Sequence, residues 1–184
     1  MKRSGCVAPS ELAAAPLGSL HSAMLALPMA TIQPFSGTEQ IDATAAKTWA
    51  VISCPEILAS CVPGLVSAEP QADKSLKCVI RPQLSFLGGS LKATISVEES
   101  TPMTRQVMRI DSSAIGMTLS VRATLELAAA GEGASTLNWH AEVIKMTGLV
   151  AALPEAVIRG AAERTIRDGL ARVKARAESQ ANAS

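Results

Sequence analysis

Two groups of polar side chains in the second half of the chain are of the types that acid–base chemistry uses. His140 and Glu142 stand two residues apart, and Arg105, Arg109 and Asp111 follow one another at odd-numbered positions of one segment. A general acid or base must point into a pocket, within reach of the reacting atom. Both groups alternate with apolar residues, which favours the solvent-facing side of a strand. We therefore predict no catalytic residues. We interpret the arginine–aspartate row as a salt-bridged surface; its alternative is a site for an anionic head group.

The cysteines and the overall composition limit the other kinds of chemistry. Cys6, Cys54, Cys61 and Cys78 form no CxxC pair, and no histidine follows at a zinc-site spacing. We interpret them as reduced, mostly buried thiols of a cytosolic protein, and predict no metal site and no cofactor. With a net charge of +1, the chain has no broad basic surface that would attract nucleic acid. With an aromatic content of 2%, it has few rings on which bases could stack. Nucleic acid is therefore not an expected partner.

The elements that would position these side chains follow from the periodicity. Segment 32–41 has strand character, and segment 43–53 is helical, with Asp42 or Thr44 as its cap and Trp49 in the core. Pro55 suits the first turn of a second short helix, which Pro63-Gly64 ends. Apolar and polar residues then alternate, as in antiparallel strands, in segments 76–81, 91–98, 103–113, 117–127 and 137–143.

A long helix follows, from Pro154 to about Glu178. It carries one apolar stripe, formed by Ile158, Ala162, Ile166, Leu170, Val173 and Ala177. This order predicts an α+β helix-grip fold. In that fold, a curved antiparallel sheet of about six to seven strands wraps around the C-terminal helix, with two short helices after the first strand. Six curved strands enclose more volume than one helix fills, so we expect a cavity between them.

We expect one helix-grip domain at residues 31–179 and a frayed tail at 180–184. Residues 1–30 are interpreted as a disordered leader or as the product of an upstream start codon, with Met29 as the natural first residue. A secretion signal is the third interpretation, but the apolar part is broken by proline and glycine. No apolar run reaches the roughly 20 residues of a membrane-spanning helix. The predicted location is cytoplasmic, or peripheral at the inner face of the membrane.

Four stretches resemble the CoxG family, which is named after an accessory subunit of carbon monoxide dehydrogenase. They are the Trp49 helix, PEILASCVPG at 55–64, GLVAAL at 148–153 and IRGAA at 158–162. The resemblance covers about residues 31–177, and it implies the START/Bet v 1-like (SRPBCC) superfamily. It also implies an accessory protein for maturation or membrane attachment of a carbon monoxide dehydrogenase-type molybdenum hydroxylase. Some members carry a quinone-like molecule. The leader, and the lack of an apolar C-terminal extension, depart from the family pattern.

From this resemblance we expect a non-enzymatic protein that binds an apolar small molecule, quinone- or lipid-like. It would support assembly, membrane recruitment or electron-acceptor supply of that enzyme. Two alternatives stay open: a cyclase- or hydrolase-like enzyme, which needs an inward carboxylate or imidazole, and a protein–protein adaptor with a fully packed core. The mouth of the cavity is expected at Pro63, Gly64, Leu65 and Arg81. The side chains expected to line it are Ile80, Leu84, Leu91, Ile95, Met108, Ile110, Met117, Leu119, Trp139, Ala141, Val157 and Ala161.

Overall fold

A computed structural model describes residues 32–82 and 89–181. The predictions for residues 1–30 and for the end of the tail lie outside these ranges, although the last helix continues to Ala181. In chain order the elements are β1 (Phe35–Ile41), α1 (Ala45–Ile52), α2 (Pro55–Ser60), β2 (Leu65–Pro70), β3 (Leu76–Ile80), β4 (Leu91–Thr101), β5 (Arg105–Ala114), β6 (Met117–Ala129), β7 (Ser135–Gly148), the 3₁₀ helix η1 (Leu149–Ala152) and α3 (Glu155–Ala181).

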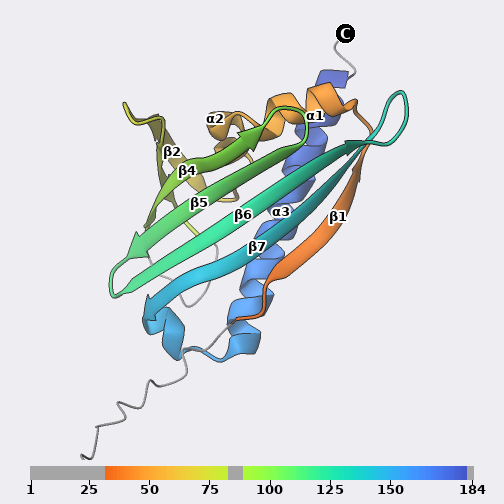
Figure 1. The fold of residues 1–184 in the computed structure, drawn as a ribbon. Helices are drawn as coiled ribbons and strands as arrows, with labels where there is room; N and C mark the ends of the chain where they lie inside the picture. The colour runs from red at the N-terminus through yellow and green to blue at the C-terminus, as the bar shows by residue number, and fades with distance from the viewer. Residues whose placement is uncertain (1–31, 83–88, 182–184) are drawn as a thin grey trace, which may run out of the picture.

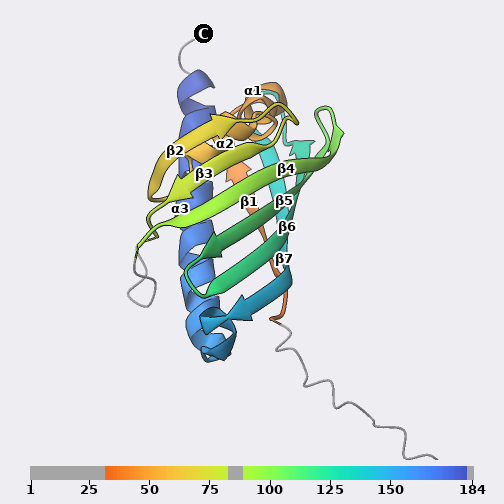
Figure 2. The same cartoon turned by 90° about the vertical axis from the view of Figure 1, so that its left-hand side faces the viewer.

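The strands form one antiparallel sheet with the order β1-β7-β6-β5-β4-β3-β2. Helix α3 runs along one face of this sheet, and α1 and α2 lie at the end near the C-terminus of α3 (Figures 1 and 2). We call the face toward α3 the concave face and the opposite one the convex face. The predicted helix-grip fold is confirmed, including the two short helices between β1 and the remaining strands.

The short helices begin where local hydrogen bonding allows. Thr44 is the N-cap of α1, because its side-chain oxygen accepts the backbone N–H of Lys47 at 3.4 Å. The backbone N–H of Asp42, the other predicted cap, donates to Glu178 of α3 at 3.1 Å instead. Pro55 occupies the first turn of α2, where its missing N–H costs no helical hydrogen bond.

The Pro-Gly corner after α2 joins the helices to the sheet. Gly64 has a φ of +81°, and its carbonyl accepts the Arg81 N–H at 2.8 Å. Leu65 then pairs with Ile80 at the start of β2. A Cβ on Gly64 would lie 2.1 Å from the Arg81 carbonyl oxygen, so this close approach of two backbones requires glycine.

Three irregularities bend the sheet. The register shifts between Leu65 and Ser67, between Val97 and Glu99, and between Ser120 and Val121. Such bulges bend a strand and increase its twist. The sheet therefore curves around the side on which α3 lies.

The core consists of two apolar clusters that share Trp139. The first includes Val51 and Ile52 of α1, and the second includes Val150 of η1. The predicted stripe of α3 contacts both: Ile158, Ala162 and Ile166 pack on the second cluster, and Leu170, Val173 and Ala177 belong to the first. Trp139 lies against Gly37, where a Cβ would stand 2.7 Å from the indole ring. Trp49 also packs on the first cluster, as predicted.

We predict that Gly64→Ala destabilises the domain by at least about 2 kcal/mol. The left-handed conformation costs an alanine about 1–2 kcal/mol, and the contact with the Arg81 carbonyl adds to this. Urea denaturation followed by tryptophan fluorescence measures the change. Gly160→Ala is the matched control, because it meets open space within α3 and gains up to about 1 kcal/mol of helix propensity. Equal effects of the two substitutions would contradict the prediction.

Candidate functional site

A row of directly paired aliphatic residues crosses the concave face. Leu76 pairs with Ile95, Ile95 with Ile110, Ile110 with Val121, and Val121 with Val143. Because paired residues of antiparallel strands point to the same face, the row directs five apolar side chains toward the α3 side. The sequence predicted which alternate residues of these strands face inward, and the strand pairing confirms that prediction.

Burial decreases along this row. Leu76 and Ile95 are 1% and 7% exposed, whereas Ile110, Val121 and Val143 are only half-buried. An inward side chain that still meets solvent shows that the helix does not fill the space before it. The same half-buried state is found for Ile80, Leu91, Leu119, Ala123 and Ala141. The middle of the concave face is thus an apolar surface that solvent can reach, and we call it the apolar groove.

A cleft of about 390 Å³ lies between β1 and α3 and borders this surface. Phe35, Trp139 and Ile166 contribute apolar walls. The guanidinium of Arg159 lies 4.9 Å from the centre of the Phe35 ring. The Trp139 Nε1–H is buried and has no hydrogen-bond acceptor among the residues that the structure describes, which costs about 1–3 kcal/mol. The cleft is further lined by Pro34, Ser36, Glu39, Glu163, Arg167 and Leu170.

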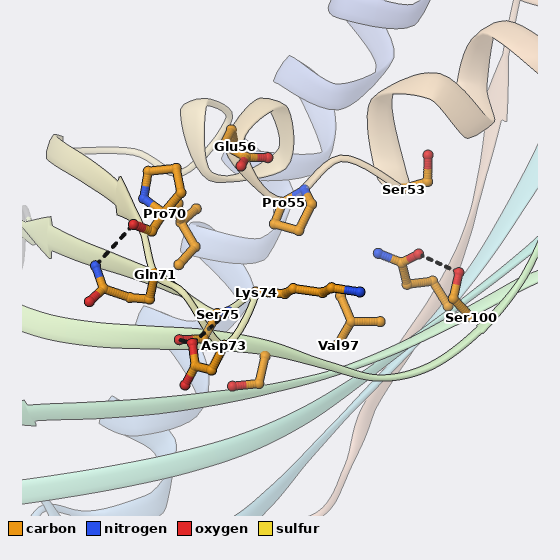
Figure 3. A pocket seen from close by; sticks show the side chains of 13 residues that line it. Ser53, Pro55, Glu56, Pro70, Gln71, Asp73, Lys74, Ser75, Val97 and Ser100 are labelled. Atoms are coloured by element: carbon orange, nitrogen blue, oxygen red, sulfur yellow. Dashed lines mark hydrogen bonds between the residues drawn. The ribbon is translucent and has the colours of Figure 1, made fainter.

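A larger hollow of about 630 Å³ occupies the other end of the sheet, beneath α1 and α2 (Figure 3). Gln106 is 1% exposed, donates to the Ile52 carbonyl at 3.1 Å and accepts from Ser100 at 3.2 Å. None of the residues predicted to line a cavity belongs to it. Sequence reasoning missed Gln106, although it stands at an inward position, where a polar residue is unusual. The remaining lining residues are Ser53, Pro55, Glu56, Pro70, Gln71, Asp73, Lys74, Ser75, Leu76, Ser96 and Val97.

The structure brings most of the predicted cavity residues together in the two core clusters. Among them, Ile95, Met108 and Met117 are fully buried. The others retain partial exposure and lie in or beside the apolar groove: Ile80, Leu91, Ile110, Leu119, Trp139 and Ala141. The predicted mouth residues Gly64 and Arg81 are also in contact, through the hydrogen bond between their backbones. Pro63 and Leu65 are half-buried beside them.

One predicted lining residue is wrong. Val157 is 43% exposed at the start of α3, because the stripe that packs on the sheet is the one through Ile158 and Ala162. Ala161 is half-buried, and Arg81 is exposed. Leu84 lies outside the described residues.

The candidate acid–base residues lie on the convex side. His140 and Glu142 are exposed. Asp111 accepts hydrogen bonds from Arg109 Nε at 2.8 Å and from Ser120 Oγ at 2.6 Å, and these bonds hold the pKa of its carboxyl below the ordinary value. Arg105 pairs with Glu99 and Glu126. The predicted salt-bridged surface is confirmed.

The cysteines of the described ranges are free, and burial raises the pKa of the Cys61 and Cys78 thiols. No group of three or more His, Cys, Asp or Glu side chains that could hold a metal ion occurs in the described part of the chain. Of the helices that the structure describes, none is long and apolar enough to cross a membrane.

The family whose sequence model matches is that of CoxG, a subunit of carbon monoxide dehydrogenase, and the match covers residues 37–178. This chain belongs to the CoxG family. The matched range contains β2–β7 and the apolar groove they form, and it ends within α3. No curated protein of similar sequence matches.

Solved structures share the fold of this CoxG-family chain at low sequence identity. A conserved protein from Geobacillus kaustophilus is similar with a TM-score of 0.74 and 18% identity, over 80% of this chain and 96% of that one. A START superfamily protein from Mycobacterium smegmatis gives 0.63 and 14%, over 80% and 98%. The Zhui aromatase/cyclase from Streptomyces sp. R1128 gives 0.62 and 14%, over 79% and 93%. These likenesses establish a START-like fold.

We predict that Ala123→Leu is tolerated, whereas Ala93→Leu is destabilising by about 1–3 kcal/mol. Both residues face inward, but Ala123 is half-buried beside the apolar groove, while Ala93 is 4% exposed in the packed core. Added methylenes fill space at the first position and overpack the second. Urea denaturation of both variants measures the difference. Destabilisation by Ala123→Leu of the same size would mean that the groove is filled in solution, as the adaptor alternative requires.

Proposed function

We propose that this CoxG-family protein is a non-enzymatic accessory protein that binds an apolar small molecule in the apolar groove. The observation that carries the proposal is the row of inward aliphatic side chains that remain half-buried opposite α3. Such a surface gains about 25 cal/mol for each Å² of apolar area that a ligand covers, before the costs of association. The cleft of about 390 Å³ has the size of known small-molecule sites.

The ligand class we propose is quinone- or lipid-like. An apolar body suits the groove, and a carbonyl or hydroxyl oxygen suits the buried Trp139 Nε1–H, which has no acceptor among the described residues. A hydrogen bond to the ligand would remove the cost of that unpaired donor. His140, Glu142 and Asp111 lie on the convex face, which favours a carrier over a cyclase- or hydrolase-like enzyme. The carboxylates that line the neighbouring cleft are those of Glu39 and of Glu163, which pairs with Arg159 at 3.9 Å.

The partner we propose is an enzyme of the carbon monoxide dehydrogenase type. Its support is the family membership, since the family name implies association with that enzyme. The protein would assist assembly of the enzyme, its recruitment to a membrane, or its supply with an electron acceptor. A carrier of an apolar electron acceptor would be useful to such an enzyme, because a molecule of this kind partitions into membranes and is scarce in water.

Native mass spectrometry of protein purified from its own host, combined with lipid extraction, tests the ligand. We expect a quinone or isoprenoid that co-purifies reproducibly and disappears after delipidation. Apo-protein alone, together with failure of added quinones to bind, would refute the carrier function.

Tryptophan fluorescence gives a second test, because the chain has two tryptophans and no tyrosine. In the Trp49→Phe variant, Trp139 is the remaining tryptophan, and a short-chain quinone should quench it in a saturable way. The Trp139→Phe variant is the matched control, because the remaining Trp49 belongs to α1 and packs against the first cluster, so its emission should change little. Equal quenching of the two variants would place the ligand away from the groove or show unspecific collisions.

A further inference from the structure

The hollow beneath α1 and α2 differs in chemistry from the apolar groove, and we call it the polar hollow. Its volume of about 630 Å³ lies within the range of known small-molecule sites. Four serines, two glutamines, two carboxylates and one lysine line it, beside the apolar side chains of Pro55, Pro70, Leu76 and Val97. An apolar ligand would gain little here, because the polar walls would lose water without finding new partners. The polar hollow is therefore suited to a second, polar ligand.

Lys74, in the turn between β2 and β3, has a backbone conformation that lysine rarely adopts. Its φ of +65° lies in the left-handed region, where glycine or asparagine is favoured. Hydrogen bonds fix the turn around it: the Lys74 N–H donates to the Gln71 carbonyl at 3.1 Å, and the Gln71 N–H donates to the Ser75 carbonyl at 2.8 Å. A residue that is held in an unfavourable conformation at the wall of a hollow indicates a requirement for its side chain.

The side chain of Lys74 points into the polar hollow, which Pro55 and Val97 also line (Figure 3). Its ammonium group forms no ion pair and no hydrogen bond with a residue that the structure describes. A free cation beside apolar walls and neutral hydrogen-bonding groups is a natural partner for a ligand carboxylate.

The two carboxylates of the polar hollow are bonded within their own segments. Asp73 accepts the Ser75 hydroxyl at 2.6 Å and the Ser75 N–H at 3.0 Å, and these bonds lower the pKa of its carboxyl. Glu56 accepts from its own backbone N–H and from the Cys54 thiol, which lowers its pKa as well. Both groups are therefore ionised at neutral pH. Two negative charges beside one free ammonium suit a zwitterion better than a simple anion.

Gln106 adds a fixed amide to the wall of the polar hollow. It is 1% exposed, and its Nε2 donates to the Ile52 carbonyl while its Oε1 accepts from Ser100. A primary amide has two N–H donors and two acceptor lone pairs. One donor and one acceptor of Gln106 therefore have no partner among the described residues. A peptide group, with one C=O and one N–H, is their complement.

We propose that the polar hollow binds a short zwitterionic peptide, such as a dipeptide. Lys74 binds its carboxylate, Glu56 and Asp73 attract its ammonium group, and Gln106 pairs with its peptide group. The apolar part of the wall, such as Val97, contacts an aliphatic side chain. This site goes beyond the proposed carrier function and does not depend on it, because the polar hollow and the cleft between β1 and α3 share no lining residue.

Isothermal titration calorimetry of the full chain with glycyl-L-leucine tests the inference. This dipeptide has the ammonium group, the peptide group, the carboxylate and the aliphatic side chain, and we expect it to bind saturably, with one molecule per chain. Glycyl-L-leucinamide lacks the carboxylate, and N-acetylglycyl-L-leucine lacks the ammonium group. Each should bind about tenfold or more weakly, because each loses a charge-assisted contact. Absence of glycyl-L-leucine binding, or equal affinity for the three compounds, would overturn the inference.

The Lys74→Asn variant separates binding from stability. Asparagine adopts the left-handed conformation more readily than lysine, so the urea midpoint should stay the same or rise, while affinity for glycyl-L-leucine falls about tenfold or more. Met103→Asn is the matched control, because Met103 also has a φ of +65°, in the turn between β4 and β5, and does not line the polar hollow. It should keep full affinity. A lowered urea midpoint or an undiminished affinity of Lys74→Asn would contradict the role of Lys74 in binding.

Discussion

One helix must cover a sheet that is much wider than itself. Neighbouring strands lie about 4.8 Å apart, so the six spacings between seven strands span roughly 29 Å, while a helix with its side chains is about 10–12 Å across. The α3 stripe therefore covers part of the concave face only. Its backbone comes near those of α1 and β1. The central strands consequently keep aliphatic side chains that face inward and remain half-buried.

Other elements close the two ends of this uncovered strip. At one end, Val51 and Ile52 of α1 are fully buried, and Gln106 ties β5 to the Ile52 carbonyl beside the hollow beneath α1 and α2. At the other end, Val150 of η1 packs on the second cluster. Trp139 joins the clusters in the middle, and it fits there because Gly37 of β1 has no side chain. The apolar groove lies between these two ends.

The two faces of the sheet carry different kinds of polar side chains. The convex face carries a salt-bridged network, for example Arg122 with Glu98 at 2.9 Å, and such exposed pairs add little stability. The concave side carries charged groups in the cleft between β1 and α3 and in the hollow beneath α1 and α2, and elsewhere uses neutral groups that satisfy one another, such as Thr48 and Ser135 at 2.8 Å. Neutral pairs avoid the high cost of burying charge. A surface built in this way suits the binding of apolar molecules.

Much of this protein could be predicted from its sequence, because the governing signals are local. Alternation over five segments assigns strands and inward faces, the α3 stripe follows from a period of about 3.6 residues, and Pro63-Gly64 marks a corner that also carries the family resemblance. Contacts between distant segments were beyond such reasoning. The phase of α3 that packs on the sheet excludes Val157, which was expected inside. The role of Gln106 depends on the carbonyl of Ile52, far earlier in the chain. Sequence determines which way each side chain points along its own element. Only tertiary structure decides how much of that face another element covers, because coverage depends on the relative width and placement of sheet and helix.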